Sequence, residues 1–180
     1  TYTIHLDVPT TADFDLYVFS NVSDEYGEPV LIAESENGFG IDESITLFAP
    51  QNATYYVVVK WVDPRYYGRE LNENYGEFKL TIVENLTAMI LEPTNHDYVK
   101  GNIEIRFYGG GRAFDNVTLE IDGTEVFTSH TSGFHTYTWD TTTTSDGTHS
   151  IRVSTFNQSG YFVSEEIEVT VDNLSLIHIS

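Results

Sequence analysis

The stretch Asp13-Phe14-Asp15-Leu16-Tyr17-Val18-Phe19 alternates strictly between two sets of side chains. Phe14, Leu16 and Val18 fall on one side of an extended chain, and both aspartates fall on the other. This period of two predicts a β-strand with one apolar face. Two carboxylates two residues apart are like charges at close range, an arrangement that suits either a hard cation or a solvated edge.

Strand patterns of this kind recur along the whole chain, and no stretch longer than about ten residues shows a helical period. The strongest strand, Thr54–Val62, contains Val57-Val58-Val59, and this triplet predicts burial on both faces. Asp122-Gly123, Asp146-Gly147 and Ser159-Gly160 are typical of turns between strands. The sequence therefore predicts an all-β chain of β-sandwiches.

The strand pattern predicts two sandwich domains in tandem. We expect the first over residues 1–84, a linker at 85–88 and the second over 89–173. Because the chain enters a strand at once, we expect its true N-terminus to lie upstream. Residues 174–180 do not continue the pattern, and Ser175–Ser180 resembles a translated sequencing-adapter tail. We interpret this end as non-native or disordered.

Composition excludes several classes of partner. The chain has 28 acidic and 8 basic residues, for a net charge of −20, which repels nucleic acid and anionic membranes. It has no cysteine for a disulfide and no run of about 20 apolar residues for membrane insertion. Six glycosylation sequons favour an exported glycoprotein, extracellular or at the cell surface, and begin at Asn21, Asn52, Asn85, Asn116, Asn157 and Asn173.

Residues 1–84 resemble the later part of a bacterial and archaeal pre-peptidase C-terminal domain, without its opening strands. The matching segments are Asp13–Phe19, Glu43–Leu47, Ala53–Val59 and Tyr75–Ile82. The resemblance implies a truncated jelly-roll-like sandwich attached to a secreted subtilisin-like or metallopeptidase. It also implies an accessory role in stability, calcium binding or substrate attachment, with catalysis elsewhere.

Residues 88–173 look like a bacterial immunoglobulin-like module. The segments that carry this resemblance are Val117–Gly123, Tyr137–Thr141 and Asp146–Val153. The resemblance implies a spacer or adhesive module without enzymatic activity. Within it, we expect Trp139 to fill the sandwich core, and Asp140 with its successor to cap the following turn.

Four acidic residues form the predicted metal site. Asp13 and Asp15, together with Asp42 and Glu43 before the next strand, could supply oxygen ligands to Ca²⁺. The alternative is that Asp15 accepts hydrogen bonds from neighbouring backbone N–H groups while the other carboxylates stay solvated.

A loop rich in tyrosine and arginine is the predicted ligand-binding site. Arg65, Tyr66 and Tyr67 are residue types that dominate binding surfaces, and aromatic faces also stack on sugar rings. The alternative is that Trp61 is buried and the tyrosines cover a sheet edge.

Catalytic signatures are missing from the sequence. It contains neither Gly-X-Ser-X-Gly nor His-Glu-X-X-His. His130, His135 and His149 have mixed parity along the predicted strands, so we interpret them as surface or turn residues rather than zinc ligands. We expect His149 to pack at the start of a strand, and we predict no enzymatic activity for this chain.

Two functional hypotheses follow. In the first, the chain is a non-catalytic accessory segment of a secreted peptidase, and it contacts a protein or polysaccharide substrate or neighbouring domains. In the second, it is part of a modular adhesin or envelope protein at the cell surface. Calcium is the one cofactor that the sequence suggests.

Overall fold

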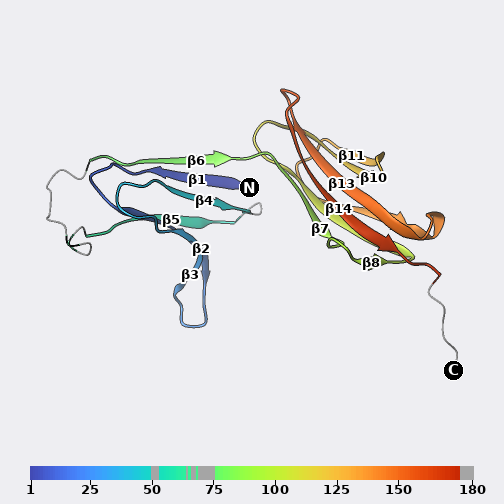
Figure 1. Ribbon diagram of the computed structural model, residues 1–180, viewed down its shortest axis with the longest axis horizontal. Coiled ribbons are helices and arrows are strands. Elements are labelled where there is room, and N and C mark those ends of the chain that lie inside the picture. Colours follow the sequence, from blue (N-terminus) through green and yellow to red (C-terminus); the bar gives the residue numbers. More distant parts are fainter. Residues whose placement is uncertain (50–52, 64, 66–67, 69–75, 175–180) are drawn as a thin grey trace. The chain divides into compact units, whose positions relative to one another are not determined.

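A computed structural model describes residues 1–49, 53–63, 65, 68 and 76–174 (Figure 1). The chain divides into two compact units, Thr1–Asn85 and Leu86–Ser180. Regular structure is almost entirely β-strand, and no α-helix occurs among the described residues, which confirms the all-β class. One strand ends at Glu84 and the next begins at Thr87, on either side of the boundary between the two units.

The described part of the first unit forms two antiparallel three-stranded sheets, ordered β4-β1-β6 and β3-β2-β5 (Figure 1). The strands are β1 (Tyr2–Asp7), β2 (Phe14–Ser23), β3 (Pro29–Ser35), β4 (Glu43–Leu47), β5 (Tyr55–Trp61) and β6 (Lys79–Glu84).

Alternate apolar residues of both sheets share one core. Ile4 and Leu6 of β1 pack in the same buried cluster as Leu16 and Val18 of β2. Because side chains from both sheets form this one buried cluster, the two sheets face each other, and the unit is a β-sandwich. The apolar face predicted from the alternation of residues 13–19 is therefore confirmed.

Strand β5 is buried on one face only, which differs from the sequence prediction. Val57 and Val59 pack against the core, but Val58 is 41% exposed and Trp61 is 39% exposed. The expected burial of β5 on both faces, and of Trp61, is therefore wrong. The physical reason is that β5 belongs to a sheet with one face on the core, so every second side chain points away from it.

A long hairpin is the second difference from the sequence prediction. Strands β2 and β3 continue beyond the sandwich as a two-stranded ribbon, shown in Figure 1. Residues 21–29, predicted as a polar loop, belong partly to this ribbon, because Ser23 pairs with Pro29. Within it, Tyr26 is exposed next to the positive-φ Gly27, which allows the tight turn.

The described second unit has a five-stranded sheet, β11-β10-β13-β14-β8, and a three-stranded sheet, β12-β9-β7 (Figure 1). Its elements are β7 (Thr87–Glu92), β8 (Tyr98–Val99), β9 (Asn102–Gly110), β10 (Phe114–Ile121), β11 (Thr124–Ser129), β12 (Gly133–Asp140), the 3₁₀ helix η2 (Thr141–Thr143), β13 (Gly147–Asn157) and β14 (Phe162–Val171).

The core of the second unit draws on both of its sheets. Phe107 and Trp139 from the smaller sheet pack with Leu119 and Val153 from the larger one. Between β10 and β11, Asp122 and Gly123 both have positive φ, the conformation predicted for an Asp-Gly hairpin turn. The second unit is therefore also a β-sandwich.

The cap expected after Trp139 is confirmed as well. Asp140 is the N-cap of η2, and its Oδ1 accepts hydrogen bonds from the Thr142 N–H and hydroxyl groups. Trp139 is 6% exposed and its indole N–H donates to the Thr144 hydroxyl at 3.3 Å. The Trp-Asp-Thr segment therefore has a structural role in this unit.

Candidate functional site

Three of the four predicted calcium ligands are buried in the first unit. Asp13 directly precedes β2 and Asp15 lies on it, whereas Glu43 begins β4 in the facing sheet. Their exposed fractions are 1%, 6% and 0%. The alternative that the carboxylates other than Asp15 stay solvated is therefore wrong for Asp13 and Glu43.

Glu43 lies against donors from the end of β3. The Ser35 hydroxyl and the Asn37 backbone N–H, at 2.7 Å, both donate to its carboxylate. Burial raises the pKa of Glu43 above its ordinary value; the two hydrogen bonds oppose this rise, and the charges of Asp15 and Asp13 add to it. The negative charges of Asp15 and Asp13 therefore disfavour the ionised form of Glu43.

Asp15 contacts a tyrosine and a lysine on the outer side of β2. The Tyr17 hydroxyl donates to Asp15 Oδ2 at 3.0 Å, and Lys60 Nζ lies 3.7 Å from the same oxygen. Burial and hydrogen bonds to Glu36 and Asp15 raise the pKa of Tyr17, so the neutral phenol persists. Lys60 also lies 5.4 Å from the centre of the Tyr17 ring.

Asp42, the fourth predicted ligand, belongs to a different cluster at the surface. Its Oδ1 accepts a hydrogen bond from the Val8 backbone N–H at 2.8 Å. Its Oδ2 lies 3.8 Å from His5 Nε2, and that nitrogen is 3.0 Å from Asp7 Oδ1. The predicted quartet is therefore divided. Asp13, Asp15 and Glu43 form a buried set, whereas Asp42 lies with His5 and Asp7 in a surface set.

The sequence prediction missed His5 and Asp7. Their spacing, i and i+2 on one strand, is the same signal that drew attention to Asp13 and Asp15. Among the described residues, His5, Asp7 and Asp42 are the one group of three possible metal ligands whose donor atoms all lie within 4.8 Å of one another.

The tyrosine-rich loop belongs only in part to the described residues. Tyr66 and Tyr67 lie outside the described residues. Arg65 is described, and its Nε and Nη2 donate to the Asp63 carboxylate at 3.0 and 2.5 Å. These hydrogen bonds from Arg65 lower the pKa of Asp63. Arg65 thus forms an ion pair within its own loop.

His130, His135 and His149, the three histidines considered as zinc ligands, do not converge on a common point. His130 Nδ1 lies 3.1 Å from the Asp115 carbonyl, and His135 Nε2 lies 2.9 Å from the Thr131 carbonyl. His149 packs near the start of β13, as predicted, but it is buried rather than at the surface.

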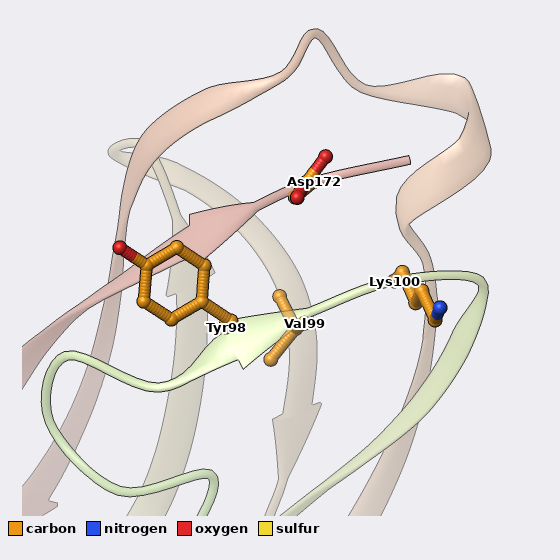
Figure 2. A pocket seen from close by; sticks show the side chains of 4 residues that line it. All are labelled: Tyr98, Val99, Lys100 and Asp172. Atoms are coloured by element: carbon orange, nitrogen blue, oxygen red, sulfur yellow. The ribbon is translucent and has the colours of Figure 1, made fainter. Parts of the chain in front are cut away.

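A shallow cavity opens beside the end of β14. Figure 2 shows that Tyr98, Val99 and Lys100 line it together with Asp172. Its volume is about 180 Å³, below the several hundred Å³ typical of small-molecule sites. The Asp172 N–H donates to the Val99 carbonyl at 3.0 Å, so this region mainly joins β8 to β14.

The described residues thus form two β-sandwich units, and the second has an immunoglobulin-like class of fold. Residues 87–153, inside the second unit, match the family model of a bacterial Ig domain. Domains of this family are typically non-catalytic, and no catalytic family matches the chain. Nothing in these comparisons supports the pre-peptidase resemblance of residues 1–84.

Solved structures give weak similarities. An endo-β-1,4-mannanase from Thermotoga petrophila is 21% identical with a TM-score of 0.44, and the match covers 49% of this chain but only 20% of the mannanase. Fibronectin(III)-like modules of Clostridium thermocellum CbhA are 15% identical with a TM-score of 0.36, covering 48% of this chain and 95% of that one.

CopC from Methylosinus trichosporium OB3b is 14% identical with a TM-score of 0.34, covering 51% of this chain and 100% of CopC. All three TM-scores are below 0.5, so they assign no function to this chain. No curated protein matches it. In the described part of the chain, no helix has the length and apolar character needed to cross a bilayer.

Proposed function

We propose that this chain is a non-catalytic accessory segment of an exported protein, in which the second unit acts as an immunoglobulin-like spacer or adhesive module. The observation that carries the proposal is the bacterial Ig domain match at residues 87–153, within a unit that has its own complete core. Domains of this family are commonly extracellular. The net charge of −20 is consistent with a soluble, solvated surface.

The proposal has two versions, which differ in the kind of protein to which this chain belongs. In the first version that protein is a secreted peptidase, a version that rests on the resemblance of residues 1–84 to a pre-peptidase C-terminal domain. An adhesin or envelope protein built of repeated sandwiches is the second. Sequencing the rest of the encoded polypeptide separates them: a peptidase domain supports the first, and further sandwiches support the second.

The outer face of the β3-β2-β5 sheet supports an attachment role for the first unit. Tyr17 and Phe19 stack there, with ring centres 6.4 Å apart and planes inclined by 26°. Their cross-strand partners, Val58 and Tyr56, are both exposed. Aromatic and aliphatic side chains gathered on one open face are typical of surfaces that bind polysaccharide or protein.

Attachment can be measured by sedimentation with insoluble polysaccharides and fibrous proteins. We expect the chain to bind at least one of them without hydrolysing it. The Tyr56→Ala variant should bind at least several-fold less, whereas Tyr98→Ala, an exposed tyrosine of the second unit, serves as the matched control. A Tyr66→Ala, Tyr67→Ala double variant tests the predicted loop in the same assay. Hydrolysis by the native chain would refute the non-catalytic proposal.

We also propose that the buried set binds calcium. Three oxygen-donor side chains suit a hard cation, and a bound cation would offset the cost of burying carboxylates. Because their donor atoms do not all lie within 4.8 Å of one another, the three side chains must rotate toward each other to share one ion. Each carboxylate oxygen keeps a second lone pair beyond its hydrogen bond, so coordination is compatible with the donors from Ser35 and Asn37. Asp42 does not fit this site, because it lies with the surface set.

Calcium should therefore stabilise the first unit. At ten times the dissociation constant, binding to the folded state contributes about 1.4 kcal/mol. For a unit of this size, that gain raises Tm by roughly 5–10 °C. Differential scanning calorimetry with calcium and with EDTA measures the shift.

The control must separate calcium binding from general screening of a highly acidic chain. Sodium chloride at matched ionic strength supplies screening without a divalent ion. The Glu43→Gln variant, which removes one charge from the buried set, should lose most of the calcium shift. Equal melting temperatures in calcium and EDTA would rule the site out.

A further inference from the structure

The surface set combines one imidazole with two carboxylates on the outer side of the β4-β1-β6 sheet. Ile4 and Leu6 of β1 point into the core, so His5 and Asp7 point outward from the same strand. Asp42 reaches them from the segment that precedes β4, the neighbour of β1. All three side chains are 39–53% exposed, so an ion in solvent can reach them.

We propose that His5, Asp7 and Asp42 form a binding site for a divalent transition metal, with Zn²⁺ as its best-suited ion. Zinc accepts imidazole nitrogen and carboxylate oxygen together, whereas calcium and magnesium prefer oxygen donors alone. The site is thus chemically distinct from the proposed calcium site. It does not depend on the proposed accessory function.

The spacing of the donor atoms fits one face of a coordination shell. Zinc lies about 2.0–2.2 Å from nitrogen or oxygen ligands, so adjacent ligands of a tetrahedral ion are about 3.4 Å apart. His5 Nε2 is 3.0 Å from Asp7 Oδ1 and 3.8 Å from Asp42 Oδ2. These two separations lie on either side of that value. The Asp7 and Asp42 donor atoms also lie within 4.8 Å of each other, so rotation of the side chains can bring all three donors around one ion.

The backbone already holds the donors in place. Strand β1 is the central strand of its sheet, where His5 pairs with Ser44 on one side and Thr81 on the other. Asp42 is anchored through Oδ1 by the Val8 N–H, and its Oδ2 is directed at His5. Metal binding therefore needs no rearrangement of the sheet, and water can complete the coordination shell.

Charge also favours a cation at this position. The first unit belongs to a chain of net charge −20, and two carboxylates face a single imidazole nitrogen. His5 Nε2 lies within ion-pair distance of both carboxylates, so all three donors face the same small volume.

Isothermal titration calorimetry of the whole chain with zinc chloride tests the proposal, near neutral pH and with excess calcium present to occupy hard-cation sites. We expect one saturable zinc equivalent. The His5→Gln variant should bind zinc at least tenfold more weakly. Asp7→Asn, which keeps the shape of the side chain, should also reduce the affinity. Circular dichroism establishes that both variants keep their strands.

His130→Gln is the matched control, because His130 is an exposed histidine without a carboxylate pair. Its zinc affinity should equal that of the native chain. A direct readout is the ring resonance of His5 in NMR spectra, which should shift with zinc but not with magnesium. The proposal is overturned if His5→Gln binds zinc as tightly as the native chain, or if zinc binds only at several weak, non-saturating sites.

Discussion

Replacing Trp139 by alanine should destabilise the second unit by about 4 kcal/mol, the typical cost of removing a large aromatic side chain from a core. Trp139 lies in a cluster with Ile105 and Phe107, and its ring meets that of His149 edge-on at 5.9 Å. The substitution leaves a cavity that these neighbours cannot fill. It also removes the N–H that donates to Thr144.

Urea unfolding followed by circular dichroism measures this loss. Phe134→Ala is the matched control, since Phe134 is an aromatic residue on the same strand, β12, but is 54% exposed. It should cost no more than about 1 kcal/mol, because less of its surface leaves water on folding. Similar losses in the two variants would mean that Trp139 does not anchor the core.

Much of the fold could be predicted because its signals are local. The alternation of residues 13–19 identifies the core face of β2, and the Asp122-Gly123 pair identifies a turn whose φ angles few other residues adopt. The faces of β5 could not be predicted in the same way. A run of β-branched residues specifies a strand, but whether a second layer covers its outer face is a property of the whole unit.

The division of the predicted metal quartet has a simple geometric reason. Asp42 and Glu43 are adjacent in the sequence, and adjacent residues of an extended segment point to opposite faces. Glu43 accordingly enters the sandwich with 0% exposure, while Asp42 stays at the surface beside His5. The alternation of side chains along an extended segment is enough to predict that Asp42 and Glu43 point to opposite faces. The nearness of His5 to Asp42 could not be read from the sequence, because it depends on the pairing of β1 with β4.

The hydrogen bonds of His149 make the stability of the second unit depend on pH. Its Nδ1 lies 2.6 Å from Asp122 Oδ2 and its Nε2 lies 2.8 Å from the Ser145 carbonyl. Both partners are acceptors, so the ring satisfies them fully only when both of its nitrogens carry protons. Burial opposes the charged ring, but the hydrogen bonds and the charge of Asp122 outweigh it and raise the pKa of His149.

The pKa of Asp122 shifts in the opposite direction, below its ordinary value. Burial acts to raise its pKa, but hydrogen bonds from His149 and the Ser150 N–H, together with the charge of His149, lower it. The contribution of Asp122 to stability is complete above its ordinary pKa of 3.8, and it is lost as the pH falls through the lower value in the folded state. The contribution of His149 is complete below 6.5 and is lost as the pH rises through the higher folded value.

The Asp122–His149 pair should therefore stabilise the second unit most between about pH 3.8 and 6.5. Within this window, His149→Ala should cost about 3 kcal/mol, because it leaves both acceptors without their donor and opens space beside Trp139. Urea unfolding of the native chain and the variant across the pH range measures the difference. That difference should shrink as the pH rises above the window. Asp122→Asn, which tolerates the positive φ at this turn, should weaken the same pH dependence. A constant difference from acid to alkaline pH would show that His149 contributes through packing alone.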